Sequence, residues 1–277
     1  MRALRTVAVT CLAAGLLTAC GSSGSGSSTA DAKPGSTASD GAAAGKGADG
    51  GANLGAKETL LASAAVMEKA GSAKLAVTGE AAGTGEFVWK APKSFLLNTK
   101  SEGQDTKVLF VGDVMYVGAG ASLAQLAGGK TWMKIDPKDD AQGAPGGGDA
   151  VGKASSLELM DPAVQLAVAA PTAVESGTET VEGQFCKHYR SDIPVDALVE
   201  KLQLKPELKT KVLDELKKKG STITVEFWIN AKNELVQQSG TGQATGFSKI
   251  TYSDLGSVQP TKAPADSEVF SLEDVLK

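Results

Sequence analysis

Hydrophobic and polar residues alternate along several stretches of this chain, and the clearest alternation spans residues 222–229. The apolar positions are Ile223, Val225, Phe227 and Ile229, and they lie between Thr222, Thr224, Glu226 and Trp228. Because successive side chains of a strand point to opposite faces, this pattern predicts a β-strand with one buried face and one mostly solvated face.

Shorter extended runs elsewhere predict a series of antiparallel strands. They lie at 75–78, 86–90, 94–99, 107–111, 114–117, 131–135, 173–176, 185–191, 234–240 and 247–255. Only Gly112 and Asp113 separate the run at 107–111 from the run at 114–117. A Gly-Asp connection supplies the positive φ of a type II′ turn, so these two runs are expected to form a β-hairpin.

Four other segments have apolar residues at helical spacing, namely 57–69, 156–169, 195–202 and 206–219. Gly71 and Gly220 are expected to end the first and the last of these helices, and Asp161 before Pro162 is a candidate N-cap. Residues 136–155 contain prolines, aspartates and a glycine run, and they predict a long loop that is either loose or a lid. Helices and antiparallel strands in this order predict an α+β fold.

The first 19 residues have the pattern of a bacterial lipoprotein signal peptide. Arg2 and Arg5 form a basic start, and the apolar run at 7–17 is shorter than the roughly 20 residues of a membrane span. Leu-Thr-Ala-Cys at 17–20 fits a lipobox, so Cys20 is expected to carry a diacylglycerol anchor on the outer, extracytoplasmic face of the cell membrane. An ordinary secretory signal with an accidental cysteine is the alternative.

Residues 20–55 are expected to be the lipidated cysteine and a disordered tether rich in Gly, Ser and Ala. This composition buries too little apolar surface to become ordered, and a coil of that length reaches about 30 Å. The remaining residues 56–277 are numerous enough for one domain with its own core. We therefore expect three parts: a signal peptide (1–19), a tether (20–55) and a folded domain (56–277).

Composition excludes several functions for the chain without its signal peptide. Without Arg2 and Arg5, 26 basic residues face 32 acidic residues, and the net charge of −6 gives no basic excess for nucleic acid. The single histidine, His188, excludes sites with two or more imidazole ligands. The Gly-x-Ser-x-Gly elbow, the Walker loop and His-Glu-x-x-His are absent from the mature chain. We therefore expect no enzyme activity, no metal and no cofactor.

Three local patterns have a chemical and a structural interpretation, and the structural one is favoured for each. Cys186 and His188 share a strand face, but a metal or a nucleophile pair lacks further soft ligands or partners there. Residues 240–246 resemble a dinucleotide loop without the helix that should follow, which favours a turn. The aspartates at 136–140 lack the closing glutamate of a calcium loop, which favours a solvated acidic loop.

Lys217, Lys218 and Lys219 end the helix predicted at 206–219. They can contact anionic lipid headgroups, or they can simply complement the dipole of the last helical turn. The second interpretation is favoured.

The order of elements behind a lipobox resembles a family of actinobacterial lipoproteins. The stretches that carry the resemblance are Val181–Arg190, Val225–Ile229 with the turn at Asn233–Val236, and Ile250–Gly256 before Ala263–Ala265. Over about residues 57–275 the chain resembles the LppX, LprA, LprF and LprG group, whose half-barrel is similar to that of LolA and LolB. The resemblance implies a curved antiparallel sheet with helices over its concave face and a cavity for the acyl chains of envelope lipids or lipoglycans.

On this interpretation the protein binds acyl chains, transfers them, and is not an enzyme. The candidate lining residues of the cavity are Phe95, Leu97, Val108, Phe110, Met115, Val225, Phe227 and Ile229. For each of them, filling a dry core is the alternative role. An envelope regulatory or sensory lipoprotein that binds a membrane protein partner without lipid cargo is the second hypothesis, and an enzyme with a cleft around His188 is the third.

Overall fold

The structure is a computed structural model, and it describes residues 54–276 except 80, 102, 136–156 and 242–246. The chain divides into two units, Met1–Gly50 and Gly51–Lys277, and every element below belongs to the second unit. The expected signal peptide, the anchor at Cys20 and nearly all of the tether lie outside the described residues. So do the acidic loop at 136–155 and most of the glycine-rich turn at 240–246.

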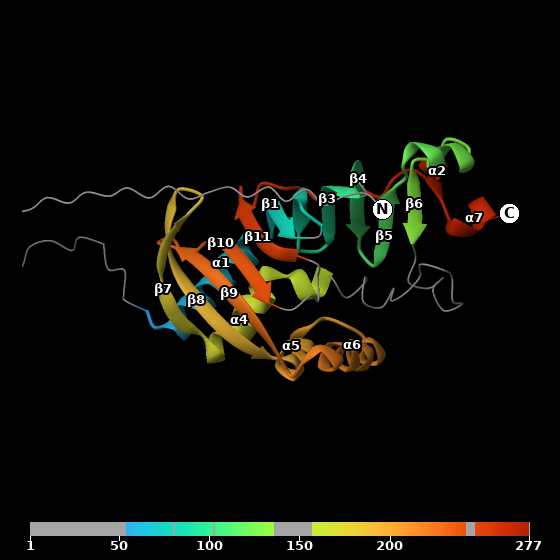
Figure 1. The fold of residues 1–277 in the computed structure, drawn as a ribbon. Coiled ribbons are helices and arrows are strands. Elements are labelled where there is room, and N and C mark those ends of the chain that lie inside the picture. Colours follow the sequence, from blue (N-terminus) through green and yellow to red (C-terminus); the bar gives the residue numbers. More distant parts are fainter. Residues whose placement is uncertain (1–53, 80, 102, 136–156, 242–246, 277) are drawn as a thin grey trace, which may run out of the picture. The chain divides into compact units, whose positions relative to one another are not determined.

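One large, mostly antiparallel sheet forms the frame of this unit (Figure 1). Its strands are β1 (Ser72–Gly79), β2 (Gly83–Val88), β3 (Ser94–Ser101), β4 (Gln104–Val111), β5 (Val114–Gly118), β6 (Trp132–Ile135), β7 (Val174–Val181), β8 (Gln184–Pro194), β9 (Thr222–Asn230), β10 (Leu235–Thr241), β11 (Phe247–Ser253) and β12 (Val269–Phe270). Their order is β12-β6-β5-β4-β3-β2-β1-β11-β10-β9-β8-β7. The sheet is open because β12 and β7 are its edges, and the predicted α+β class with a curved sheet is confirmed.

The sheet consists of two meanders joined in the middle. Strands β1 to β6 pair in sequence order, as do β7 to β11, and β1 pairs with β11 to join the two series. The predicted hairpin at residues 107–117 is confirmed, because Val111 lies opposite Val114 and Gly112 has a φ of 57°. Only the short pair β12–β6 is parallel among the described strands.

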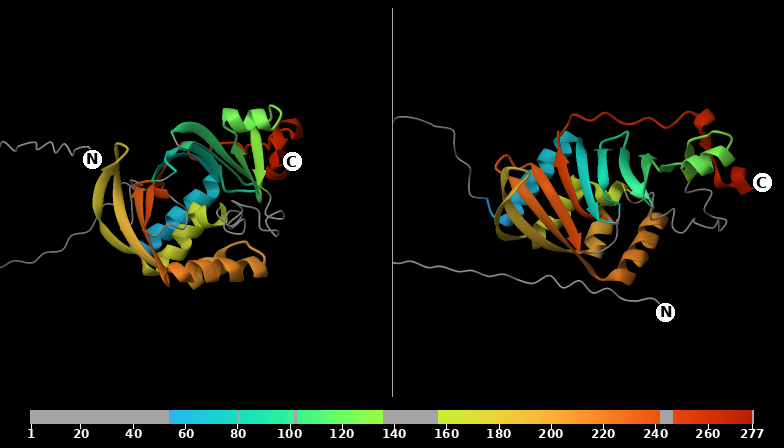
Figure 2. Two further views of the ribbon diagram at one scale, coloured as in Figure 1. Left: turned by 45° about the vertical axis from the view of Figure 1, so that its right-hand side comes forward. Right: turned by 45° about the horizontal axis from the view of Figure 1, so that its top comes forward.

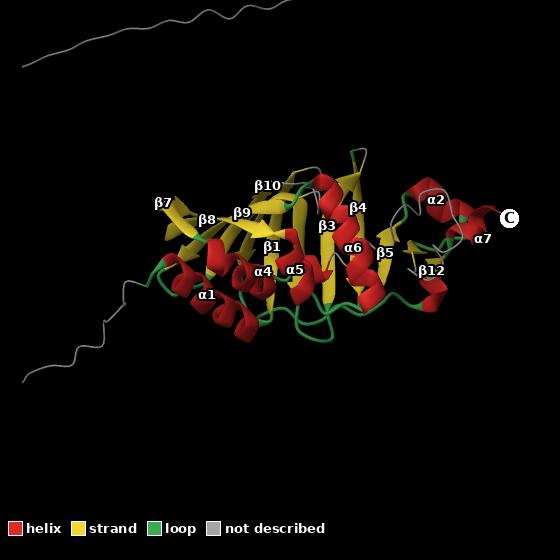
Figure 3. Cartoon of the chain, turned by 90° about the horizontal axis from the view of Figure 1, so that it is seen from below, coloured by secondary structure: helices red, strands yellow, loops and turns green. Residues whose placement is uncertain are grey.

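The helices are α1 (Ala56–Ala70), α2 (Ala121–Leu126), α4 (Pro162–Ala169), α5 (Val195–Lys201), α6 (Pro206–Lys219) and α7 (Leu272–Leu276). Two short 3₁₀ turns, Ala170–Thr172 and Asp266–Glu268, and a helical turn at 157–160 are also present. Figures 2 and 3 show α1, α4, α5 and α6 on one side of the sheet, which we call the inner face. The opposite side is the outer face.

The end of α1 is attached to the end of β2. Gly71 closes the helix with a φ of 72°, and its amide donates a hydrogen bond to the carbonyl oxygen of Met67. The indole Nε1 of Trp89 donates to the same oxygen at 2.9 Å, and the Trp89 amide donates to the oxygen of Gly71 at 3.0 Å. These contacts fix α1 against the inner face, with Leu60 and Met67 fully buried.

The sequence and the structure differ in several elements. The helix predicted at 156–169 is interrupted at Asp161, and the predicted N-cap is confirmed, because the Asp161 carboxylate accepts hydrogen bonds from the amides of Ala163 and Val164 in α4. A separate helical turn, 157–160, precedes this cap. The sequence pattern gave no sign of α2, β12 or α7, which are all short.

Trp228 is a further correction. The alternation at 222–229 predicts a mostly solvated position for this residue, but only 6% of its surface is exposed. On the outer face it belongs to a small cluster with Val181, Cys186 and Val236, which we call the outer cluster.

Candidate ligand-binding site

Six of the eight candidate lining residues belong to the main hydrophobic cluster between the sheet and the helices, and the other two, Val108 and Met115, pack against it. The eight residues form two groups rather than one. Phe95 and Leu97 on β3 lie opposite Phe110 and Val108 on β4, and Phe110 lies opposite Met115 on β5. Val225, Phe227 and Ile229 lie on β9, and the strands β2, β1, β11 and β10 separate them from the first group. Strand order, which the sequence pattern does not supply, sets this separation.

An aromatic row runs along the inner face in the first group. The rings of Phe87 and Trp89 are 5.4 Å apart, those of Phe87 and Phe95 are 5.8 Å apart, and those of Phe95 and Phe110 are 6.2 Å apart. Tilted and edge-on rings at such distances attract one another beyond the effect of their buried area. The row therefore gives the inner face a rigid apolar wall across β2, β3 and β4.

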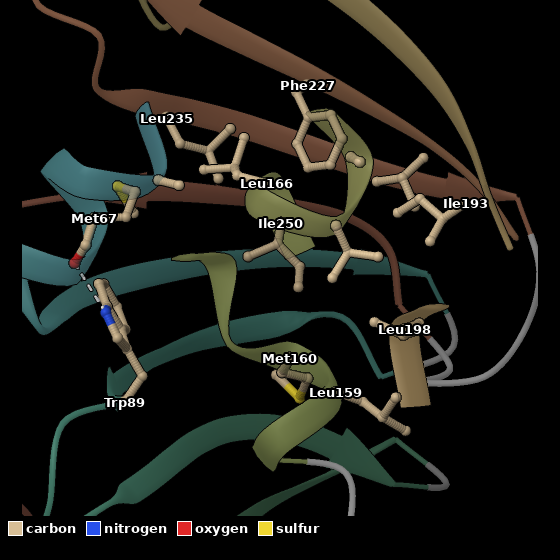
Figure 4. Packing of buried hydrophobic residues seen from close by; sticks show 14 of the residues in the cluster. Met67, Trp89, Leu159, Met160, Leu166, Ile193, Leu198, Phe227, Leu235 and Ile250 are labelled. Carbon is tan, nitrogen blue, oxygen red and sulfur yellow. Dashed lines mark hydrogen bonds between the residues drawn. The ribbon is translucent and has the colours of Figure 1, made fainter. Parts of the chain in front are cut away.

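The middle of the inner face is closely covered by helical residues (Figure 4). Leu166 of α4 lies beside Phe227 and Ile250 in that view, and Leu166 and Phe227 are fully buried. Leu159 and Met160 belong to the same cluster. The sequence analysis did not include these helical residues in the lining, although the helical spacing at 156–169 contained the signal for them.

Burial decreases along the inner face toward β6. Phe95 and Leu97 are each 2% exposed, and Phe110 is 8% exposed. Val108 and Met115 are only partly buried, and so are the inner-face residues next to them, which are Val117, Met133 and Ile135. Among the described residues, the apolar strip of the sheet thus continues beyond the part that α1 and α4 cover.

The α5–α6 pair provides a second apolar surface on the inner side of the sheet. Val212 and Leu216 are buried, and Leu204 and Leu213 pack against the main cluster while remaining partly exposed. The Nζ atom of Lys209 donates to the carbonyl oxygen of Glu200 at 2.7 Å and so ties the two helices together. In Figure 3, α6 lies on the inner side of the sheet and is seen in front of β3 and β4.

The lysines at the end of α6 have partners within the protein. The Nζ atom of Lys217 lies 2.7 Å from a carboxylate oxygen of Asp196, and Lys218 pairs with Glu215. Both ammonium groups are therefore paired with carboxylates of the protein, and both lie at the C-terminal end of the helix, where positive charge complements the helix dipole.

Cys186 and His188 lie on the outer face, away from the apolar strip. Burial raises the pKa of the Cys186 thiol, and its side chain is fully buried in the outer cluster. A buried thiol with a raised pKa is a poor nucleophile. The His188 ring stacks on Trp228 with the centroids 4.4 Å apart, between Glu179 and Glu226, each 3.9 Å from a ring nitrogen. The Trp228 indole N–H donates a hydrogen bond to Glu179.

No group of three or more His, Cys, Asp or Glu side chains suited to a metal ion occurs in the part of the chain that the structure describes. Among the same residues, no helix is both long enough and apolar enough to cross a membrane.

No model of a known protein family matches this chain. A curated relative from Streptomyces griseus, described as an uncharacterized 31.2 kDa protein in the rplA-rplJ intergenic region, is 29% identical over 170 residues. The match covers 60% of this chain and 56% of the relative, so the chain spans little more than half of that protein's length.

Two solved structures of mycobacterial lipoproteins are similar to this chain. LprF from Mycobacterium bovis is 13% identical, with a TM-score of 0.45 over 76% of this chain and 96% of LprF. The Mycobacterium tuberculosis lipoprotein LppX is 15% identical, with a TM-score of 0.43 over 74% of this chain and 98% of LppX. LprF and LppX both belong to the group of lipoproteins that the sequence motifs resemble.

Proposed function

We propose that this protein is a lipid-anchored, non-enzymatic envelope protein that binds acyl chains on the inner face of its sheet and transfers them. The observation that carries the proposal is the partly exposed apolar strip formed by Val108, Met115, Val117, Met133 and Ile135. Such a strip offers an acyl chain a row of hydrocarbon groups that the described helices leave partly exposed. Each buried methylene contributes about 0.8 kcal/mol, so a long chain gains considerable affinity from a short strip.

In this proposal each of the three parts of the chain has its own role. Residues 1–19 act as the signal peptide, Cys20 carries the lipid anchor, residues 21–55 form the tether, and residues 56–277 form the binding domain. The lipobox at 17–20 supports the anchor and a location on the extracytoplasmic face of the cell membrane. The domain on its tether is then free to meet lipids of the envelope.

Within this site the two lining groups have different roles. The β3–β5 group, with Val108 and Met115, contacts the acyl chain, whereas Val225, Phe227 and Ile229 on β9 lie in the closely packed middle and support the sheet. The dense middle also favours a second candidate function. An envelope regulatory lipoprotein without cargo needs only a filled core, and the full burial of Leu166 and Phe227 fits that function too.

A fluorescent long-chain fatty acid tests the proposal. The double variant Val108→Gln, Met115→Gln places polar groups on the strip and is expected to bind about tenfold more weakly, because an unpaired amide in an apolar site costs on the order of 1–2 kcal/mol. Val114→Gln is the matched control, because residue 114 precedes Met115 on β5 and points to the outer face. Equal affinity in the double variant and the control would contradict acyl binding at this strip.

A further inference from the structure

The outer face of the sheet carries a groove that the proposed lipid site does not use. Side chains from four neighbouring strands share this face, because Lys74 on β1 lies opposite both Glu86 on β2 and Ser253 on β11. Likewise, Thr84 on β2 lies opposite Asn98 on β3. Helices α1, α4, α5 and α6 lie on the other side of the sheet, so none of them covers this surface (Figure 3).

Two turns raise a wall along one side of these strands. Glu182 and Gln184 come from the β7–β8 turn, and Glu234 comes from the turn before β10. The side-chain amide of Asn230 joins the two turns, because its Nδ2 donates to Gln184 Oε1 and to Glu234 Oε2, each at 2.8 Å. The wall and the strands enclose a groove of about 880 Å³, which we call the acidic groove.

The charges that line the acidic groove are unbalanced. Its carboxylates are Glu86, Glu182, Glu234 and Asp254, and its one ammonium group is that of Lys74. The Lys74 Nζ lies 2.8 Å from Asp254 Oδ2, so this cation is held by one of the four carboxylates. The described lining thus has a net charge of −3, and a concave surface with one sign of charge concentrates its potential inside the groove.

We propose that the acidic groove docks an extended, lysine- or arginine-rich segment of a partner protein. Charge complementarity selects a cation, and the apolar surface of Ala76 and Leu96 between the carboxylates suits the methylene stems of lysine and arginine. Hydroxyl and amide groups of Thr84, Asn98 and Thr251 offer hydrogen bonds to a peptide backbone.

The dimensions of the groove also favour a peptide. Strands β3, β2, β1 and β11 lie side by side, and at about 4.8 Å per strand they span roughly 14 Å, the length of four to five extended residues. A sugar is less suited, because the one aromatic residue of the lining, Tyr252, is 4% exposed and belongs to the inner-face cluster. Anionic lipid headgroups are repelled by the same carboxylates that attract the peptide.

The test measures binding of the capped peptide Lys-Ser-Lys-Ser-Lys to the full-length chain carrying Cys20→Ser, followed by NMR of backbone amides. We expect shifts at Thr84, Asn98 and Thr251 and a Kd that rises at least tenfold in the Glu86→Gln, Glu182→Gln variant. The variant Glu200→Gln, Glu207→Gln makes the same charge change on α5 and α6, outside the groove, and its Kd is expected to stay within twofold of the parent chain. Glu182→Gln alone, at an exposed turn, is expected to weaken binding and keep the fold.

Three results would overturn the proposal. They are equal weakening in the groove variant and the control, peptide-induced shifts on α5 and α6 instead of the sheet, and no binding at millimolar peptide. Preferential binding of the Glu-Ser-Glu-Ser-Glu peptide, or of vesicles of anionic phospholipid, would also contradict it. None of these outcomes depends on the lipid site, because that site lies on the inner face.

Discussion

At the scale of single residues, Asp161 caps a helix as its sequence context predicts, but its burial disfavours the charged form of its carboxyl group. Its carboxylate caps α4, and it lies 3.7 Å from the Lys93 ammonium group, which also contacts Glu158 at 2.7 Å. Desolvation by burial raises the pKa of Asp161, and the opposing effects of Lys93 and the two capping amides are smaller. The charged form is therefore less favourable in the folded protein than in the unfolded chain.

The sign of this shift gives a prediction. A carboxyl group with a raised pKa stabilises the fold at low pH, and that contribution is lost as pH rises above its ordinary value of about 3.9 and through the raised pKa. Asp161→Asn keeps a capping oxygen without the charge, so its free energy of unfolding relative to the wild type should increase between pH 4 and pH 8. Urea unfolding across this range measures the difference.

Asp161→Ala is the control for the cap itself. It removes the capping oxygen and should lower the free energy of unfolding by about 1 kcal/mol. If Asp161→Asn is as unstable as Asp161→Ala at pH 8, the charge of Asp161 is a net benefit and this account of it is wrong.

At the scale of elements, Gly85 on β2 is a point of close strand approach on the inner face. A Cβ atom at this position would lie 2.1 Å from the carbonyl oxygen of Leu96, so a side chain requires the strands to shift. Glycine in a strand interior commonly marks such a close approach of the backbone. This position allows β2 and β3 to approach closely beside the aromatic row.

Gly85→Ala should therefore lower the free energy of unfolding by about 1–3 kcal/mol, as overpacking does in cores. The comparison is Gly240→Ala on β10, where an added Cβ has no atom within 4 Å and a small gain or no change is expected. Thermal and urea unfolding measure the stability of both variants relative to the wild type. Equal stabilities of the two variants would contradict the clash.

The sequence predicts an element well when neighbouring residues determine it, and poorly when contacts with distant strands determine it. The Gly112 turn and the alternation at 222–229 are local, so both elements were predicted from neighbouring residues alone. Burial of Trp228 depends on His188 and Val236, which lie on adjacent strands, and the pattern along β9 contains no information about them. The short β12 has too few residues for a periodicity, and it exists because it pairs with β6.

The same limit applies to the positions of the candidate lining residues. The inner-face positions follow from alternation, and all eight lie in the main cluster or pack against it. Their division into two groups follows from the pairing of β1 with β11, a contact between residues about 180 positions apart. The difference in exposure between Phe227 and Met115 follows from where α1 and α4 pack, and side-chain periodicity does not specify that.

At the scale of the whole molecule, we propose an anchor, a tether and a domain whose inner and outer sheet faces each bind a ligand. Cys20→Ala removes the thiol that we propose is lipidated, so the protein should move from the membrane fraction to the soluble fraction of the envelope. Loss of two acyl chains removes far more affinity than a tether can replace. Fractionation followed by immunoblotting measures the change, and an unchanged membrane fraction would contradict the anchor.

The central claim is that the inner face carries an acyl chain, and native mass spectrometry of the full chain purified from a bacterial host that lipidates Cys20 tests it most directly. We predict noncovalent lipid adducts, released by collisional activation, on the wild type and on Val114→Gln. The Val108→Gln, Met115→Gln variant should lose most of these adducts while its circular dichroism spectrum is unchanged. A wild-type protein that carries only its covalent anchor, and takes up no lipid from added envelope extracts, would contradict the account.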